Sequence, residues 1–305
     1  MKKIQILLSS YNGEAHIRKQ IESFLTLDNA QEVAVLIRDD GSTDGTREIL
    51  KEYEGREGFR ILYGENVGLN ASLQALFEVA DPECLYYAYA DQDDVWLPEK
   101  LSLACAALDK ESADEPVMYT ARSILTDVTG KRIGVTRIPR RTPSFANAMV
   151  QNVCIGHTQV YNRPMLRLLR ENYSDGMFVT DHWAYLLASA FGKIVYDNTP
   201  TTLYRQHGKN AIGYGHNAVT VFKNRVRRTL AGVPRAHAKQ LIAFRDTCGD
   251  RLPPEHAKTL SRFLAARRGF FRRLGYLFCG EAHRQSFFEN LGFRLLYLFG
   301  GYNEK

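Results

Sequence analysis

The chain has 305 residues, of which 45% are hydrophobic and 24% charged, and its formal net charge is +6. This balance describes an ordinary globular chain with room for one large domain or two smaller ones. The mild positive excess fits an anionic partner, such as a nucleotide, a nucleic acid or an acidic membrane, without choosing among them.

The cysteines argue against a disulfide framework and against a zinc site, because the five of them are scattered and lack CxxC spacing. We therefore expect a reducing compartment. The apolar run at Ile4–Leu8 is too short for a signal peptide, and no stretch reaches the roughly 18 apolar residues that cross a bilayer. A cytoplasmic location is the resulting expectation.

The first hundred residues alternate strand and helix patterns. Strands are expected at Ile4–Leu8, Val33–Ile37, Ile61–Tyr63 and Leu85–Ala90. Between them, helical spacing places one helix around Ile17–Leu25, one beginning near Thr43 or Asp44, and one at Leu69–Ala80. This order predicts an α/β fold with a mostly parallel, Rossmann-like sheet flanked by helices.

The remainder is more mixed. We expect a hairpin at 117–135 around Asp127–Gly130, a helix at His182–Phe191, and three further extended segments, at Val153–Tyr161, Ile194–Tyr196 and Thr201–His207. From about Asn217 the chain reads as helical and basic. This predicts a catalytic domain at 1–216, with halves at about 1–110 and 111–216, and a helical C-terminal region at 217–305.

Polar segments follow each of the four early strands. They are Ser9–Glu14, Asp39–Thr46, Asn66–Asn70 and Asp91–Asp94. Because ligands of parallel α/β sheets bind at the carboxyl ends of the strands, these four loops together predict one site at one edge of the sheet.

The segment Asp91-Gln92-Asp93-Asp94 carries three carboxylates that repel one another. A bound Mg²⁺ or Mn²⁺ relieves that repulsion, and such ions commonly bridge one or two carboxylates to substrate phosphates. The alternative is a solvated acidic loop that caps the helix following Pro98.

Two other loops also have structural alternatives. Asp39–Thr46 reads either as a strand-to-helix turn with capping residues or as a site where a carboxylate accepts a hydrogen bond from a nucleotide base. Ser9–Glu14 lacks the glycine pattern of a P-loop or dinucleotide fingerprint, and Tyr11 is placed to stack on a base or to begin a capped helix.

Later in the chain, Asp181 reads as a helix N-cap or as a functional acid. Tyr204-Arg205-Gln206-His207 combines a cation and an imidazole that suit a pyrophosphate or a metal. His157 and His216 are interpreted as structural.

Taken together, these segments resemble the inverting family 2 glycosyltransferases of the GT-A fold. The matching motifs are Leu8-Ser9-Ser10-Tyr11-Asn12-Gly13, Asp39-Asp40-Gly41-Ser42-Thr43-Asp44, Asn66-Val67-Gly68 and the DxD-type Asp91-Gln92-Asp93, which occur in the family's order. Asp91–Trp96, Asp181–Trp183 and Tyr204–Gly208 are similar more narrowly to bacterial rhamnosyltransferases, which use dTDP-L-rhamnose.

The resemblance implies roles for particular residues. Ser9, Tyr11 and Asp39 would hold the nucleoside, and Asp91 and Asp93 the ribose and the metal, with His207 helping at the metal or diphosphate. Asp181 would be the general base. The donor site as a whole would take in further residues: Glu14, Asp40, Asn66, Gly68, Gln92 and Arg205.

The resemblance implies a reaction that transfers a sugar, rhamnose from dTDP-L-rhamnose, with inversion at the anomeric carbon. The acceptor would be a saccharide or polyprenyl-linked saccharide in bacterial surface polysaccharide synthesis. A metal-dependent nucleotidyl or phosphoryl transferase is the rival enzyme. A basic nucleic-acid-binding protein is the non-enzymatic rival, and the acidic loops argue against nucleic acid as a partner.

The C-terminal region mixes aromatics with paired arginines, as in Phe270–Phe278, Phe287-Phe288 and Phe293–Phe299. Such segments suit the surface of an anionic membrane, at the inner face of the cytoplasmic membrane. The alternatives are a helical appendage packed on the catalytic domain and a homodimer contact.

Overall fold

The computed structural model describes residues 3–206 and 231–303. Its contacts divide the chain into two units, each built from several segments. Unit 1 comprises residues 1–137, 154–171 and 192–213, and unit 2 comprises 138–153, 172–191 and 214–305. The predicted domain boundary at residue 216 stays a prediction.

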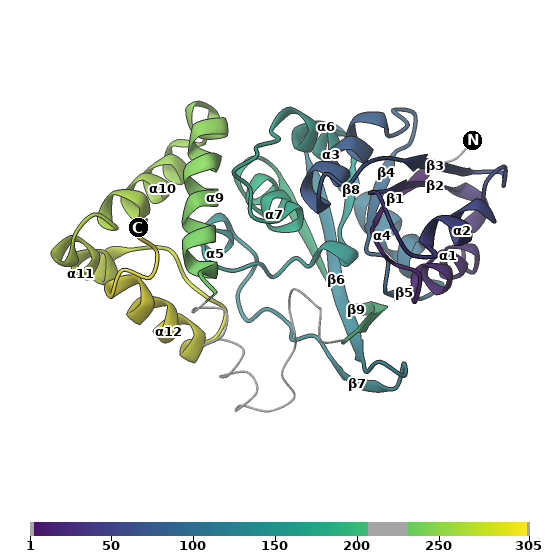
Figure 1. The fold of residues 1–305 in the computed structure, drawn as a ribbon. Helices are drawn as coiled ribbons and strands as arrows, with labels where there is room; N and C mark the ends of the chain where they lie inside the picture. The colour runs from purple at the N-terminus through teal and green to yellow at the C-terminus, as the bar shows by residue number, and fades with distance from the viewer. Residues whose placement is uncertain (1–2, 207–230, 304–305) are drawn as a thin grey trace. The chain divides into compact units, whose positions relative to one another are not determined.

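Unit 1 is a mixed sheet with helices on both faces (Figure 1). Its strands are β1 Ile4–Ser10, β2 Val33–Asp39, β3 Phe59–Tyr63, β4 Tyr86–Ala90, β5 Val95–Trp96, β6 Val117–Thr126, β7 Arg132–Val135, β8 Val160–Asn162 and β9 Lys193–Arg205. Its helices are α1 Ile17–Leu25, α2 Thr46–Lys51, α3 Leu69–Val79, α4 Lys100–Leu108 and α6 Arg163–Glu171, with short 3-10 turns at Ala30–Glu32 and Gly156–Thr158.

The four early strands are parallel neighbours in the order β3-β2-β1-β4, as the sequence predicts. Beyond β4, strand β8 is antiparallel to β4 and to β6, and β6 runs parallel to β9. The α/β class is therefore confirmed, and the sheet as a whole is mixed. The hairpin of β6 and β7 is confirmed as an antiparallel pair.

Alternation along β1 explains why both faces of the sheet are covered. Ile6 and Leu8 join a buried cluster with residues of α1, α2 and α4. The side chain of Ser9 points to the other face, where its hydroxyl lies 2.6 Å from that of Ser72 in α3. A strand buried on both sides needs apolar residues at nearly every position, which β1 has.

The structure differs from the sequence analysis at three places in the middle of the chain. In the expected strand Val153–Tyr161, most residues form an irregular segment and a 3-10 turn, and only Val160–Asn162 is a strand. The two extended segments around Pro200 are one strand, β9, whose register against β6 shifts twice. The acidic loop does not cap α4, because that helix begins after Glu99 and has no side-chain cap.

Unit 2 is helical in its described residues. Its helices are α5 Phe145–Ala148, α7 Thr180–Phe191, α9 Val233–Cys248, α10 Pro254–Ala266, α11 Phe270–Cys279 and α12 Phe287–Leu298, with a 3-10 turn at Gly249–Arg251. Trp183 of α7 packs edge-on against Phe244 of α9, with ring centroids 5.3 Å apart. The helical character of the C-terminal region is confirmed for residues 233–298.

No helix in residues 3–206 or 231–303 is long and apolar enough to cross a membrane.

A substitution at Gly192 can test how closely the backbone segments of unit 1 pack. A Cβ added at Gly192 would lie 2.1 Å from the carbonyl oxygen of Pro116, which belongs to the backbone and cannot rotate away. We expect Gly192→Ala to lower the free energy of unfolding by about 1–3 kcal/mol, measured by urea denaturation. Gly275→Ala, inside α11 and with no atom within 4 Å of the added Cβ, is the control and should not lower the stability. Equal stability of the two variants would contradict this packing.

Candidate active site

The loops that follow β1 and β2 are joined by hydrogen bonds. The backbone N–H of Asn12 donates to the hydroxyl of Ser42 (2.9 Å), and the Asn12 side-chain oxygen accepts from the backbone N–H of Thr43 (2.8 Å). Asn12 has a φ of 48°, a left-handed conformation that asparagine tolerates better than most residues. The backbone N–H of Gly13 donates to the Thr46 hydroxyl (2.8 Å). The two loops thus form one surface.

Glu14, predicted to bind the donor, faces the second loop. Its carboxylate accepts from the backbone N–H of Gly45 (3.1 Å), and its own backbone N–H donates to Asp44 (3.2 Å). Gly45 is the residue before α2, so Glu14 holds the start of that helix. A donor-binding role for Glu14 stays a prediction.

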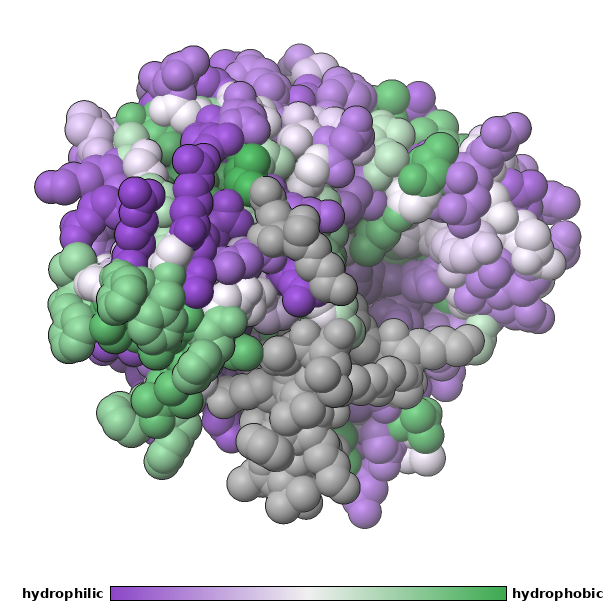
Figure 2. Space-filling model, turned by 60° about the vertical axis from the view of Figure 1, so that its left-hand side comes forward, coloured by the Kyte–Doolittle hydropathy of each residue, from purple (hydrophilic) through white to green (hydrophobic). Residues whose placement is uncertain are grey.

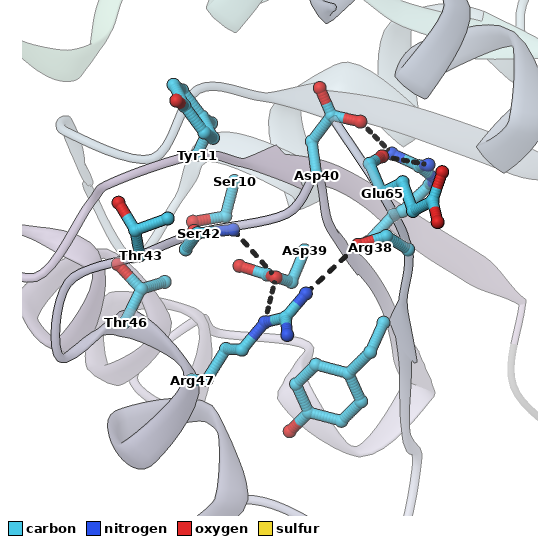
Figure 3. A network of polar contacts seen from close by, with 12 residues as sticks. Ser10, Tyr11, Arg38, Asp39, Asp40, Ser42, Thr43, Thr46, Arg47 and Glu65 are labelled. Carbon is cyan, nitrogen blue, oxygen red and sulfur yellow. Dashed lines mark hydrogen bonds and ion pairs between the residues drawn. The ribbon is translucent and has the colours of Figure 1, made fainter. Parts of the chain in front are cut away.

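Asp39 ends β2 and is fully buried. One carboxylate oxygen accepts from the backbone N–H of Ser42 (3.1 Å) and from the guanidinium of Arg47 (2.6 Å), as Figure 3 shows. The other oxygen, Oδ1, is buried and has no hydrogen-bond partner in the described part of the chain. An unsatisfied buried carboxylate oxygen costs free energy, so this atom is suited to accept a hydrogen bond from a ligand.

Asp40 points away from Asp39 and serves the third loop (Figure 3). Its carboxylate pairs with Arg38 and accepts from the backbone N–H groups of Val67 (3.1 Å) and Gly68 (2.9 Å). Gly68 has a φ of 84° and precedes α3, which explains a glycine there. Asp40 and Gly68 therefore shape the loop, and Asn66 is exposed on it.

Gln92 joins the acidic loop to the loop after β1. Its side-chain oxygen accepts from the backbone N–H of Tyr11 (2.9 Å) and from the Ser10 hydroxyl (2.9 Å), and its amide NH₂ donates to the carbonyl of Tyr11 (3.0 Å). A Cβ at Gly13 would meet the Gln92 side chain at 2.4 Å. This two-way pairing leaves the ring of Tyr11, 46% exposed, at the surface beside the acids.

Three groups of the described chain with metal-ligand chemistry lie within 4.8 Å of one another, namely Asp91, Asp94 and His157. Nδ1 of His157 is 3.2 Å from a carboxylate oxygen of Asp94 and 3.6 Å from one of Asp91. Asp94 and His157 are fully buried, whereas the side chain of Asp91 is about one third exposed. Asp91 also accepts a hydrogen bond from the hydroxyl of Tyr89 (2.8 Å).

His157 is in contact with residues of several elements. Its Nε2 is 2.7 Å from the Ser123 hydroxyl, its ring packs on Tyr204 with centroids 4.5 Å apart, and its carbonyl accepts from the buried ammonium of Lys100 (2.9 Å). Lys100 also donates to Thr202 and lies over the ring of Trp96. Two buried basic side chains, His157 and Lys100, thus lie near the acidic loop.

Burial and charge act in opposite directions on these groups. Burial raises the pKa of Asp94, His157 opposes the rise, and Asp91 and Asp93 add to it. Burial also lowers the pKa of His157, but the carboxylates of Asp94 and Asp91 outweigh it and the net shift is upward. Burial lowers the pKa of Lys100 to about 7. The protonation of each of these groups therefore depends on the charge of the others.

The other predicted residues of this region have definite places. Asp93 is partly exposed, and its carbonyl accepts from the guanidinium of Arg205 (3.3 Å), which also donates to the carbonyl of Val128 (3.2 Å). Arg205 therefore positions the acidic loop through its backbone. Ser9 is buried beside Ser72. His207 lies outside the described residues.

Asp181 belongs to unit 2 and lies in the first turn of α7, partly exposed. The helix begins at Thr180, so Asp181 is inside the helix and the N-cap interpretation is wrong. A carboxylate in the first turn still interacts favourably with the helix dipole.

From the sequence, His157 is interpreted as structural and is not connected with the acidic loop, which it contacts in the structure. Its only signal is a histidine within an apolar segment, and a buried histidine of that kind is usually structural. What brings it to the acids is the 3-10 turn at Gly156–Thr158, where a strand was expected.

The structure is an α/β fold of the GT-A type with polar loops at one edge of its sheet. The sequence model of glycosyl transferase family 2 matches residues 5–170. The chain therefore belongs to glycosyl transferase family 2.

The relatives with curated descriptions are distant. An uncharacterised protein of Mycobacterium tuberculosis is 29% identical over 224 residues, which are 71% of this chain and 62% of that protein. The dTDP-rhamnosyl transferase RfbG of Shigella flexneri is 26% identical over 218 residues, 68% of this chain and 73% of RfbG. The match therefore spans less than two thirds of the mycobacterial relative.

Solved structures share the fold. TarS of S. aureus in complex with UDP superposes with a TM-score of 0.57 at 17% identity, over 90% of this chain and 74% of TarS. The mannosyltransferase PcManGT of Pyrobaculum calidifontis, in complex with GDP-Man and Mn²⁺, has a TM-score of 0.50 at 14% identity, over 98% and 85% of the two chains. These likenesses show a GT-A fold.

Removing His157 should expose how the acids depend on it. His157→Leu leaves Asp94 buried without its cationic partner, and we expect a loss of about 3–5 kcal/mol in the free energy of unfolding. Adding Asp94→Asn should recover part of that loss, because the buried charge is removed with its partner. Urea denaturation of both single variants and the double variant measures the coupling. His256→Leu, at a histidine packed on Phe145, is the control. Strict additivity would show that the pair does not interact.

Proposed function

We propose that the chain transfers a sugar, with inversion at the anomeric carbon, from a nucleoside diphosphate to a saccharide or polyprenyl-linked saccharide acceptor. The observation that carries this proposal is the buried, unpartnered Oδ1 of Asp39, at the end of a parallel strand beside an acidic loop. A buried acceptor at this position suits the ring N–H of a nucleobase.

The chemistry of Asp39 favours uracil or thymine over cytosine. Uracil and thymine present an N–H at ring position 3, whereas neutral cytosine presents an acceptor there. The ring of Tyr11 is exposed for stacking, and Ser9 completes the predicted nucleoside set. RfbG is described as a dTDP-rhamnosyl transferase and TarS was solved with UDP. These likenesses support dTDP-L-rhamnose as the proposed donor.

The acidic loop fits a divalent cation. Donor atoms of Asp91, Asp94 and His157 lie within 4.8 Å of one another, but Asp94 and His157 are fully buried. We therefore assign the cation to Asp91 and Asp93, the acids with exposed surface, with His207 as the predicted third ligand. Mg²⁺ and Mn²⁺ both prefer such oxygens, and PcManGT was solved with Mn²⁺. Such a cation stabilises the charge that develops on the leaving diphosphate.

The remaining steps fall to the chain's own residues. Asp181 takes the proton of the acceptor hydroxyl as its oxygen attacks the anomeric carbon, and the bond from that carbon to the diphosphate oxygen breaks. A single displacement inverts the centre and needs no carboxylate nucleophile. Arg205 acts by fixing the backbone of Asp93, and Gln92 by fixing that of Tyr11. Asp40, Asn66, Gly68 and Glu14 shape the surrounding loops.

Product analysis tests the proposal. The purified chain is incubated with a panel of nucleotide sugars and Mg²⁺ or Mn²⁺, with and without saccharide acceptors. We expect dTDP or UDP donors to be consumed before CDP donors, with release of nucleoside diphosphate. Release of pyrophosphate would instead indicate the nucleotidyl transferase, and salt-sensitive binding of generic RNA without turnover would indicate the nucleic-acid-binding protein. The cytoplasmic location is part of the proposal.

Asp93→Asn removes a charge from the proposed cation site and keeps the shape of the side chain. We expect turnover to fall by at least about 100-fold and Mn²⁺ affinity, measured by isothermal titration calorimetry, to fall by about tenfold or more. Asp114→Asn, on an exposed loop, is the control and should match the parent in both. Full turnover of the parent in a chelator would remove the cation from the mechanism.

Asp181→Asn tests the general base. We expect transfer to fall by about 10²–10⁴-fold while nucleotide binding stays within about twofold, because the base acts on the acceptor. Asp175→Asn, an exposed aspartate in the segment before α7, is the matched control. If the only effect of Asp181→Asn is a stability loss of about 0.3–1 kcal/mol, Asp181 serves the helix dipole and another group is the base.

A further inference from the structure

The last two helices of unit 2 expose apolar stripes. In α11, Phe271 and Phe278 are two turns apart on one face and are 83% and 86% exposed. In α12, Phe288, Leu291, Leu295 and Phe299 follow the spacing of a second face, and all four are exposed. Figure 2 shows hydrophobic residues gathered over this end of the unit.

These stripes are not the faces that stabilise the helices. Each helix has a separate buried face, formed by Tyr276 in α11 and by Phe293 and Tyr297 in α12. The buried rings surround Phe263 of α10, with centroid distances of 4.9–6.5 Å. Both helices are therefore apolar on two sides, and in the described part of the chain only one of those sides packs into a core. Exposed aromatic surface of this kind marks an interaction site.

The surroundings of the stripes are cationic. Residues 267–299 contain six arginines and two glutamates. Two arginines are used internally, since Arg267 donates to the carbonyl of Tyr302 and Arg273 to those of Leu298 and Arg267. Arg268 and Arg272 are exposed, and Arg272 directly follows Phe271. Hydrophilic residues border the hydrophobic area in Figure 2.

The positive charge of the α11–α12 surface favours an anionic membrane over a second copy of the chain as its partner. In a symmetric homodimer each surface patch faces its own copy, so arginines would approach arginines and oppose association. An anionic bilayer offers acyl chains to the phenylalanines and phosphates to the arginines. We propose that the α11–α12 surface docks on an anionic membrane, with Phe271, Phe278, Phe288 and Phe299 in the acyl boundary and Arg268 and Arg272 at the headgroups. This inference goes beyond the proposed reaction and does not depend on it.

Co-sedimentation of the full chain with vesicles tests the docking. The vesicles are pure phosphatidylcholine or contain about one third phosphatidylglycerol, at low and at high salt. We expect the chain to pellet with anionic vesicles at low salt, at least about tenfold more than with neutral ones, and less at high salt. Failure to pellet with anionic vesicles at low salt would overturn the proposal.

Two variants separate the apolar and the ionic contributions. Replacing Phe271, Phe278, Phe288 and Phe299 by serine should lower vesicle binding by about tenfold or more, because these rings provide the buried area. Arg268→Gln with Arg272→Gln should lower binding to anionic vesicles and leave the weak binding to neutral vesicles unchanged. The matched controls are Val79→Ser with Val128→Ser, and Arg132→Gln with Arg167→Gln, all at exposed positions of unit 1.

Folding and self-association are checked on the same samples. Each variant must keep the parent's circular dichroism and its nucleotide binding, which reports on unit 1 independently of vesicles. Parent-like vesicle binding by a folded four-phenylalanine variant overturns the proposal. So does light scattering that shows a parent dimer, a monomeric variant and no vesicle binding by either, since the surface then belongs to a second copy. Absence of sugar transfer leaves the vesicle result unaffected.

Discussion

The site depends on the register of β1 between its two parallel neighbours. Ser10 pairs with Asp39 of β2, and Leu8 pairs with Ala90, the last residue of β4. This register brings the ends of three strands to the same level, so the loops that follow them meet. A shift of one residue would turn the side chains of β1 to the opposite faces and separate the loops. The polar network of Asn12, Gln92 and their partners can form only because the register is fixed.

Adjacent aspartates in these loops have different tasks. In the first pair, Asp40 forms an ion pair with Arg38 and accepts hydrogen bonds from two backbone N–H groups. Oδ1 of Asp39 has no hydrogen-bond partner in the described part of the chain. In the second pair, Asp94 is buried against His157, while Asp93 keeps exposed surface. Asp40 and Asp94 thus contact the interior of their loops, and Asp39 and Asp93 are the acids that we propose for ligand binding. The basic partners Arg38 and His157 therefore offset part of the repulsion between neighbouring carboxylates.

Unit 2 combines a conventional core with a surface that is unusual for a globular protein. Aromatic rings packed around Phe263 stabilise its last helices from one side, and phenylalanines stand exposed on the other. Helices anchored in this way keep their exposed rings in a fixed arrangement without any binding partner. A surface with that property meets a membrane at a small cost in conformational entropy.

The sequence by itself determined the α/β class, the order of the early strands and the loops that carry the site, because hydrophobic periodicity and strand-end polarity are local properties. It did not determine which acid of each pair pairs with a buried basic residue, since that depends on Arg38 and His157, which reach the acids only through tertiary contacts. It also did not predict the contact of His157 with the acids, because that residue lies in a 3-10 turn and not in the expected strand. Side-chain exposure in α11 and α12 likewise followed from packing, since both faces of each helix are apolar.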